Sequence, residues 1–592
     1  MDMLRERPDR SDRELARVLG CSRSEVRRVR EGLLRASSRS TESSHTSIAF
    51  WQRFELALGL IIVGFALALR IANYLEIKAN DPYFSNFTVD PRLYHEWAIR
   101  ICDGDWMGAG SFHLGPLYPY VLGVCYAIFG SGPEVGHLLN VILGTVSVGL
   151  IWLLARDVFG WRSGLVAALL AAAYPMLIYT GCDLVLENVQ VPLNALVLLL
   201  LCRALSRPRL WLFCCAGLCL AMSALARPNV LLYVPCVLAC IALARREGAA
   251  WRTVMTRCAA MVLGVAVGIA PITIRNWLAT GDVILVTDNG GLNFYVGNNP
   301  DATGYFNPPG WISTVQFGDP DRMRAFATQH ARDALGHEPS PSEVSAHWRG
   351  MAWSWMRGSP ADALALLARK AWLLLSSNEF GVERQLVLDQ GYSWVLRLPA
   401  PGFEVVVPLA LLGMVVSRLP FRSVLALDLF VLSQSLALVL FFISDRYRVP
   451  MAPAVMALAG AGGVWLVDVV CQRRWRMAAG GVCCVALMSW ATIRPLDSNV
   501  TASNFYNLGN KLRDQGKFDE AVAQYRLAIE IQPRDISPHN NLALILERIP
   551  SGRAEAVREW ELVWGLARDS GDQARLERAE RHLKALGQVP RH

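Results

Sequence analysis

Apolar stretches long enough to cross a lipid bilayer recur along this chain from Phe54 to Ile493, and they restrict its fold more than any other feature. A hydrocarbon core of ~30 Å needs roughly 20 mostly apolar residues per helix, and about eleven stretches approach that length. The sequence therefore predicts an all-α, polytopic helical membrane protein. The expected spans are residues 54–75, 135–155, 164–181, 189–205, 210–225, 229–244, 258–274, 403–416, 424–443, 451–470 and 477–493.

The composition agrees with a membrane protein and excludes other classes. Of the 592 residues, 53% are hydrophobic and 18% are charged, which rules out a disordered or collagen-like chain. Lys and Arg number 58 against 50 Asp and Glu, a net charge of +8, but these cations interrupt apolar runs, so nucleic acid is an unlikely partner. Most of the 14 cysteines lie inside the apolar runs, and no CxxC or HExxH spacing occurs, so no zinc site is expected.

Arginines beside the spans predict the orientation, because cations at span ends are retained on the cytoplasmic side. With the N-terminus inside, every short basic loop falls on that side. An odd number of spans then places the loops 76–134 and 275–402 and the C-terminal tail outside, in the periplasm of a bacterial inner membrane protein. The inside arginines are Arg156, Arg162, Arg203, Arg207, Arg209, Arg245, Arg246, Arg252, Arg257, Arg418, Arg422, Arg473, Arg474 and Arg476.

The N-terminal tail, residues 1–47, is basic and is expected to be cytoplasmic. It lacks the apolar core and cleavage site of a removable signal peptide. Ser11 to Val26 combines a capped helix, a turn at Gly20 and a second amphipathic helix, which resembles the helix-turn-helix of DNA-binding proteins. A short helical hairpin near anionic lipid explains the same pattern, and we favour that interpretation.

The C-terminal tail, residues 496–592, has a polar amphipathic pattern that matches the tetratricopeptide repeat (TPR). A degenerate second unit and a charged capping helix, residues 573–586, follow the first unit. We therefore expect a periplasmic α-solenoid domain that binds a protein partner or acceptor. The matching positions of the first unit are Leu508, Gly509, Leu512, Ala521, Tyr525, Ala528 and Pro533.

Polar residues that border the predicted spans gather on the expected outer side, and such residues are costly to keep near a bilayer. A carboxylate among them could deprotonate a hydroxyl, and several arginines could hold a phosphate. Each of these residues alone can also be interpreted as an interfacial charge that extends toward lipid headgroups. Because they lie on the same side, together they predict an outward-facing cavity. They are Asp90, Asp183, Glu187, Arg227, Asn229, Arg275, Asn276, Asp445, Arg446 and Arg448.

Short motifs follow one another through the segment from Phe54 to about Pro495. The clearest are Asp90-Pro-Arg-Leu-Tyr94, Gly115-Pro-Leu-Tyr118-Pro119, Ala226-Arg-Pro-Asn229, Arg275-Asn-Trp277, the segment Asn289 to Pro300, and Arg446-Tyr-Arg-Val-Pro450. This ordered series resembles the GT-C membrane glycosyltransferases, in particular the bacterial protein mannosyltransferase-like members of family 39. The resemblance implies a GT-C transmembrane domain over residues 48–495, and several such proteins also end in TPR units.

The resemblance further implies transfer of a sugar from a polyprenyl-phosphate carrier to a hydroxyl of a protein, glycan or lipid at the outer face. Asp90 matches the acidic residue that such enzymes place near the acceptor, and Glu187 is the second candidate carboxylate. Some relatives direct a lysine of a Lys-Pro-Pro-Leu element toward the carrier phosphate, but this chain has Leu114 there, beside His113. The candidate phosphate ligands are Arg275, Arg446, Arg448, Arg227 and His113. The candidate acceptor or cavity residues are Tyr94, Tyr118, Asn276 and Asn298.

The sequence leaves a metal ion and two other functions open. Asp90 and Glu187 either bind a divalent cation or form ion pairs with arginine, and no other cofactor is expected. The alternative functions are a noncatalytic TPR scaffold for envelope assembly and a lipid-sugar transporter, although a transporter predicts broken spans or internal repeats. The segment Asn289 to Pro300 is interpreted as a tight turn that caps the cavity. Trp348, Trp353, Trp355 and Trp372 are interpreted as an interfacial aromatic belt rather than as sugar-stacking residues.

Overall fold

The computed structural model describes residues 53–87, 89–306, 309, 320–377, 384, 386–417, 420–493 and 498–588. Within these ranges the chain forms helices and one isolated bridge between Tyr305 and Ile443, but no strand, which confirms the all-α prediction. Contacts between residues divide the chain into two units, Met1–Ile61 and Ile62–His592. In the first unit, the structure describes only the start of the helix Arg53–Asn80. The predicted N-terminal tail, 1–47, and the boundary between residues 495 and 496 lie outside the described residues.

Seven described helices are long and apolar enough to cross a membrane, and one bent pair of helices adds an eighth candidate span. This pair, α7 (Trp161–Ala173) and the segment Pro175–Cys182, is bent by 57°. The chain is therefore a multi-pass helical protein. The seven are Arg53–Asn80, α6 (Pro133–Phe159), α9 (Glu187–Ser206), Pro228–Arg245, α12 (Trp251–Thr280), α20 (Phe421–Leu440) and Asp445–Cys471, which contains α21 (Asp445–Arg448) and α22 (Ala452–Cys471).

The predicted count of about eleven spans is higher than this number. The other three predicted spans are helices, but α10 (Leu210–Ala226) has 17 residues, α19 (Phe403–Val416) has 14, and α23 (Trp475–Thr492) is less apolar. A helix of 14 residues is only ~21 Å long, which is short of the ~30 Å hydrocarbon core. Two of them pack on longer neighbours, α10 on α12 and α19 on α22.

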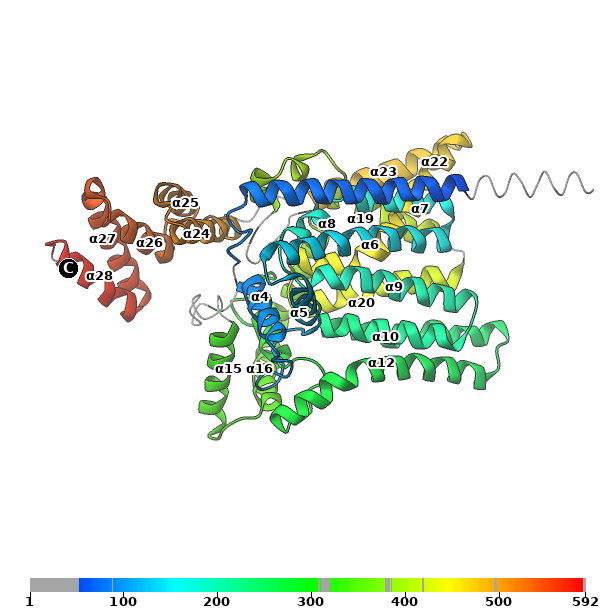
Figure 1. Ribbon diagram of the computed structural model, residues 1–592, viewed down its shortest axis with the longest axis horizontal. Coiled ribbons are helices and arrows are strands. Elements are labelled where there is room, and N and C mark those ends of the chain that lie inside the picture. Colours follow the sequence, from blue (N-terminus) through cyan, green and yellow to red (C-terminus); the bar gives the residue numbers. More distant parts are fainter. Residues whose placement is uncertain are drawn as a thin grey trace, which may run out of the picture. The chain divides into compact units, whose positions relative to one another are not determined.

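The long helices α6, α9, α10 and α12 lie side by side as a bundle (Figure 1). Glycines allow the closest of these approaches, between α10 and α12. A Cβ on Gly217 would lie 2.2 Å from the carbonyl oxygen of Met261, and a Cβ on Gly264 would lie 2.1 Å from that of Cys214. Small residues at a helix crossing bring two backbones into contact, a common device of membrane helices. Any larger residue at Gly217 or Gly264 would force these helices apart.

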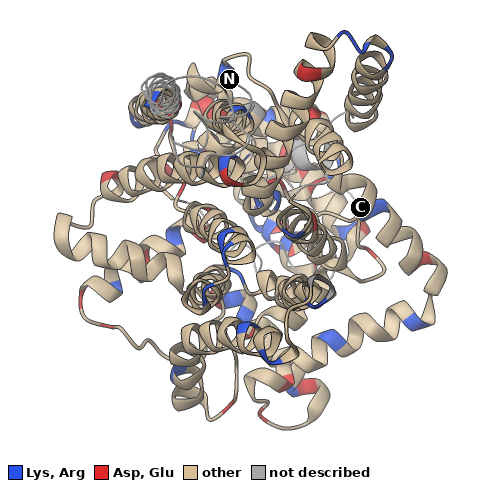
Figure 2. Cartoon of the chain, turned by 90° about the vertical axis from the view of Figure 1, so that its right-hand side faces the viewer, with Lys and Arg blue, Asp and Glu red and all other residues tan. Residues whose placement is uncertain are grey.

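Charged residues occupy only short patches of the helical ribbon (Figure 2). Two ion pairs join predicted inside loops to the ends of neighbouring helices. Arg203 lies 2.7 Å from Asp157, and Arg162 lies 2.5 Å from Asp468. These contacts gather the ends of α6, α7, α9 and α22 at the same end of the bundle, as the arrangement of basic loops requires.

The two predicted outer loops contain helices of their own. The first holds α4 (Val89–Cys102) and α5 (Leu117–Phe129). Figure 1 shows α4 and α5 at one end of the long helices, together with α15 and α16 of the second loop. The prediction of a tight turn over Asn289 to Pro300 is wrong, because Gly290 to Gly297 form helix α13. The second loop comprises α13 (Gly290–Gly297), α15 (Pro320–Leu335), α16 (Pro341–Gly358) and α17 (Pro360–Leu374).

The C-terminal region is the predicted α-solenoid. Each helix packs on the next, and Tyr525 and Trp560 are fully buried between them. The Trp560 indole also donates a hydrogen bond to Glu547 Oε1 at 2.6 Å. The two helical hairpins and the capping helix of the prediction are therefore present. They are α24 (Ser498–Asp514), α25 (Phe518–Ile531), α26 (Ile536–Leu546), α27 (Arg553–Ser570) and α28 (Gln573–Ala585).

Candidate active site

An ion pair joins Asp90 to Arg446, although 356 positions separate them in the sequence. Asp90 lies in the first turn of α4, and Arg446 lies in the short helix α21. The Arg446 Nη2 atom is 2.5 Å from Asp90 Oδ2, and the two side chains are 15% and 17% exposed. A carboxylate in the first turn of a helix is stabilised by the helix dipole. The predicted base and one predicted phosphate ligand are thus in direct contact.

A second ion pair joins Glu187 to Arg227. Glu187 begins α9, and Arg227 directly follows α10. Their Oε1 and Nη2 atoms are 2.5 Å apart, and the Glu187 side chain is fully buried. The other carboxylate oxygen, Glu187 Oε2, is buried without a hydrogen-bond partner among the described residues. A buried polar atom without a partner is costly, so it is a candidate contact for a ligand.

Two tyrosines bring these ion pairs together into one site. The guanidinium carbon of Arg227 lies 3.7 Å from the centre of the Tyr447 ring, and that of Arg446 lies 5.4 Å from the same point. Both distances fall within the range of cation–π attraction. Tyr94, one turn after Asp90, is buried beside both pairs, and burial, with the Asp90 charge next in importance, holds the pKa of Tyr94 well above its ordinary value. Tyr94 therefore remains a neutral hydrogen-bond donor.

The helix α21 also lines an apolar cavity of about 280 Å³. Its residues Asp445 and Arg448 are the charged residues of the lining, and most of the other lining residues are apolar side chains, many of them from α19, α20 and α22. Arg448 donates a hydrogen bond to the carbonyl oxygen of Ser376 at 2.5 Å, and its guanidinium stacks 4.2 Å above the Phe403 ring. Thus Arg446 and Arg448 lie two residues apart but face different environments.

A small cavity of about 40 Å³ adjoins Arg446 and Asp445. Asp183 and Arg384 line it as well. Burial raises the pKa of Asp183 to about 6, although the charge of Arg384 opposes this shift. Arg384 itself lies 2.7 Å from both Asp81 and Asp389, so this guanidinium joins the two outer loops.

Arg275 and Asn276 hold the first outer loop and do not join the ion-pair cluster. Arg275 Nε donates to the carbonyl oxygen of Met107 at 2.7 Å, and its guanidinium lies 4.0 Å from the Phe112 ring centre. Asn276 is fully buried, and its Oδ1 accepts a hydrogen bond from the backbone nitrogen of Phe112 at 3.2 Å. Because both side chains contact the backbone of the first outer loop, their role is to position that loop.

Tyr118 and Asn298 lie in two different places. Tyr118 packs edge-on against Tyr94, with ring centres 6.0 Å apart, and donates to Asn140 Oδ1 at 2.9 Å. Tyr118 therefore packs against the Tyr94 ring and helps to hold it in place. Asn298 is buried elsewhere, where its Oδ1 accepts a hydrogen bond from Lys370 Nζ at 2.9 Å.

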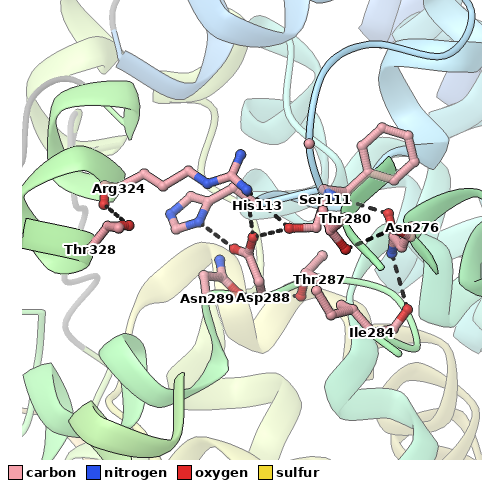
Figure 3. Close-up of polar contacts among 12 residues, drawn as sticks. Ser111, His113, Asn276, Thr280, Ile284, Thr287, Asp288, Asn289, Arg324 and Thr328 are labelled. Carbon is pink, nitrogen blue, oxygen red and sulfur yellow. Dashed lines mark hydrogen bonds and ion pairs between the residues drawn. The ribbon is translucent and has the colours of Figure 1, made fainter. Parts of the chain in front are cut away.

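His113 belongs to a separate polar cluster around Asp288 (Figure 3). Its Nδ1 atom is 2.7 Å from Asp288 Oδ1, while Ser111 Oγ and Arg324 Nη2 contact Asp288 Oδ2 at 2.5 and 2.9 Å. Burial opposes ionisation of Asp288, but the His113 hydrogen bond and the nearby cations outweigh it and hold the pKa of Asp288 below its usual value. Gly115 anchors this loop at α10, since a Cβ there would lie 1.9 Å from the carbonyl oxygen of Ala226.

The arrangement of carboxylates bears on the open question of a divalent cation. Over the described ranges, no group of three or more His, Cys, Asp and Glu side chains could hold a metal ion. Asp90 and Glu187 each contact a guanidinium instead. Of the two alternatives, the structure contains the ion pairs with arginine.

Comparison with known proteins supports the motif series. Residues 113–274 match the family model described as dolichyl-phosphate-mannose-protein mannosyltransferase, and residues 509–549 match that of the TPR repeat. The resemblance to protein mannosyltransferase-like glycosyltransferases is confirmed. No curated protein matches the chain.

Solved structures of two proteins are similar to this chain at low sequence identity. ArnT from Cupriavidus metallidurans bound to undecaprenyl phosphate is 14% identical, with 87% of this chain and 80% of that chain covered and a TM-score of 0.40. The Archaeoglobus fulgidus oligosaccharyltransferase in the apo form is also 14% identical, with 80% and 59% covered and a TM-score of 0.43. This chain therefore spans less than two thirds of the archaeal enzyme.

Sequence reasoning missed several residues of these clusters. Tyr447 stands between two predicted phosphate ligands, Arg446 and Arg448, but an uncharged aromatic residue at the end of a span gives no functional signal of its own in the sequence. Asp288, Arg324 and Arg384 lie in the second outer loop, where no periodic pattern distinguishes a functional charge from a surface charge. Lys370 lies in an amphipathic helix, α17, and its complete burial was not foreseeable from its neighbours.

Proposed function

We propose that this protein transfers a sugar from a polyprenyl-phosphate donor to a hydroxyl acceptor at the periplasmic face of a bacterial inner membrane. In this reaction a bond forms between the acceptor oxygen and C1 of the sugar, and the bond from C1 to the phosphate oxygen breaks. Asp90 takes the acceptor proton, and the polyprenyl phosphate leaves with the added negative charge. A hydroxyl is a weak nucleophile, so a carboxylate within hydrogen-bond reach assists its attack.

The observation that carries this proposal is the arrangement of α21 between two environments. Arg446 and Tyr447 adjoin Asp90 and Arg227, while Asp445 and Arg448 are the charged residues that line the apolar cavity. A polyprenyl phosphate has the same two parts, a long apolar chain and an anionic head. With the part of the chain nearest the phosphate in the cavity, the head would lie at α21, next to the candidate base. The match to a family named for a dolichyl-phosphate donor supports this assignment.

Among the candidate phosphate ligands, we assign Arg446 and Arg448 to the donor phosphate. Arginine binds phosphate through two parallel hydrogen bonds, and its fixed charge stabilises the leaving group as negative charge builds up. Arg446 pairs with Asp90 in the structure, so the incoming phosphate would compete for this guanidinium. Arg227 stays with Glu187 and supports the site through Tyr447.

The domain assignment follows from this function. Residues 48–495 form the membrane glycosyltransferase, residues 496–592 form the periplasmic TPR domain, and the basic tail, 1–47, stays in the cytoplasm. TPR units bind other proteins through grooves between stacked helices. The TPR domain would therefore recruit the acceptor or a partner protein to the outer face.

The test compares cell-envelope glycans and glycoproteins by mass spectrometry in cells with and without this protein. We expect a hexose-bearing species to disappear without the protein, to return with the wild type, and to stay absent with Asp90→Asn. The matched control is Glu96→Gln, because Glu96 lies on the same helix in an exposed ion pair with Arg92. Full restoration by Asp90→Asn would exclude Asp90 as the base. Glycans that are unchanged without the protein would favour a noncatalytic scaffold, and intact glycans that accumulate on the wrong membrane face would favour a transporter.

A further inference from the structure

The cluster around Asp288 borders a cavity of its own, of about 190 Å³. His113, Asp288 and Arg324 line this cavity with polar groups, and Trp348 is among its other lining residues. Typical sites for drug-sized ligands have ~300–1,000 Å³. This cavity is smaller, with room for an occupant such as a single sugar ring.

The polar lining of the cavity offers unused hydrogen-bonding groups. Figure 3 shows Asp288 between His113 and Ser111, with Arg324 alongside. Because an ionised Asp288 only accepts hydrogen bonds, His113 donates through Nδ1, and its Nε2 is left as an acceptor when the ring is neutral. His113 Nε2 is buried without a hydrogen-bond partner in the described part of the chain. Arg324 is one-third exposed and can donate to a ligand.

The charges in this cavity favour a neutral occupant. The Asp288 carboxylate lies at the centre of the cluster and would repel a phosphate placed beside His113. The Asp288 carboxylate and the Arg324 guanidinium carry opposite charges and lie 2.9 Å apart. A neutral ligand with several hydroxyl groups satisfies both the donors and the acceptors, whereas an anion satisfies only the donors.

The cavity is also lined by apolar side chains. Pro339, Pro341 and Val344 line it together with Trp348, whose indole nitrogen donates to the carbonyl oxygen of Ala327 at 3.1 Å. Trp348 is completely buried, while Trp353 and Trp372 are 45% and 50% exposed, so Trp348 does not belong to an interfacial belt. A pyranose ring likewise has hydroxyl groups at its edge and apolar C–H faces.

We propose that this cavity, which we call the Asp288 pocket, binds one sugar ring of a substrate. The inference rests on the proposed sugar transfer and names a second contact region for it. The ring is either the sugar carried by the lipid donor or a sugar of a glycan acceptor, and both offer the same hydroxyl chemistry. In this assignment His113 contacts a sugar rather than the carrier phosphate.

The test uses the purified full-length protein in detergent and saturation-transfer NMR with methyl α-D-mannopyranoside, methyl α-D-glucopyranoside and N-acetylglucosamine. At least one of these sugars should receive saturation from the wild type. Asp288→Asn and Arg324→Gln should each weaken that binding by about tenfold or more, because each removes a charged hydrogen-bonding group. The matched control is Arg332→Gln, since Arg332 lies two turns after Arg324 on α15 in an exposed pair with Glu338.

Kinetics of sugar transfer then distinguish the two sources of the ring. A raised KM for the lipid-linked donor in Arg324→Gln assigns the pocket to the donor sugar, and a raised KM for the acceptor alone assigns it to the acceptor. Unchanged KM values with unchanged sugar binding would overturn the Asp288 pocket and leave the proposed function intact. A wild type that binds these sugars but transfers none would overturn the proposed function, and loss of that binding in Asp288→Asn would still support the pocket.

Discussion

Replacing Asp90 by Asn tests the proposed reaction most directly. Asn keeps the size of the side chain and an oxygen that accepts a hydrogen bond from Arg446, which lies 2.5 Å from Asp90. The substitution removes the negative charge and with it the capacity to take a proton. It therefore separates the chemical role of Asp90 from its role as a partner of Arg446.

The two roles predict effects of different size. A hydrogen bond to a charged group contributes about 1 kcal/mol more than a neutral one, so we expect Asp90→Asn to lower the free energy of unfolding by about that amount. Loss of a general base should slow transfer roughly 10²-fold or more, which corresponds to about 2.7 kcal/mol in the activation barrier. The ion pair is one-sixth exposed, so solvent limits the stability effect further.

The assay is single-turnover transfer from a polyprenyl-phosphate sugar by the full-length protein in liposomes, together with its abundance and melting temperature. We expect nearly normal abundance and melting for Asp90→Asn with a rate about 10²-fold lower, and normal behaviour for Glu96→Gln. A normal rate for Asp90→Asn at normal abundance would refute the reasoning. Glu187, with its unpartnered Oε2 atom, would then become the leading carboxylate.

Three further predictions concern topology, the TPR domain and a buried lysine. A reporter fused after His592 should be active only in the periplasm, and cytoplasmic activity there would contradict the predicted orientation. Deleting residues 503–592 should spare transfer to a small soluble acceptor but impair transfer to the natural one, and equal loss with both would indicate a structural role. Burial lowers the pKa of Lys370 to about 7, so the unfolded chain binds more protons between pH 7 and about 10.4. The melting temperature should therefore rise with pH across that window, and Lys370→Met should remove this contribution.

The elements that could be predicted from the sequence are those with a strong local pattern. Seven of the predicted spans are long apolar helices, and the repeat around Gly509 and Tyr525 forms the predicted solenoid. The predicted count of about eleven exceeds the seven or eight candidate spans among the described helices, because local hydropathy does not show whether an apolar segment continues as one straight helix. The 14-residue helix Phe403–Val416 is apolar throughout but too short to cross the core alone.

The candidate site was predictable only in part. Asp90, Glu187, Arg227 and Arg446 were all selected because charges at span ends are costly, and the structure brings these four together. Their pairing depends on how distant helices pack, which one sequence does not show. His113 was selected as a phosphate ligand, but its actual neighbour, Asp288, is 175 positions away, in a loop without a periodic pattern.

The pairing of Asp90 with Arg446 has a consequence for the order of events in the proposed reaction. When the donor phosphate binds at α21, it competes with Asp90 for Arg446 and thereby releases the carboxylate toward the acceptor. Arg448, two residues along the same short helix, contacts the cavity assigned to the lipid chain. In the proposed reaction, binding of the carrier would therefore free Asp90 from Arg446 and let its carboxylate contact the acceptor hydroxyl.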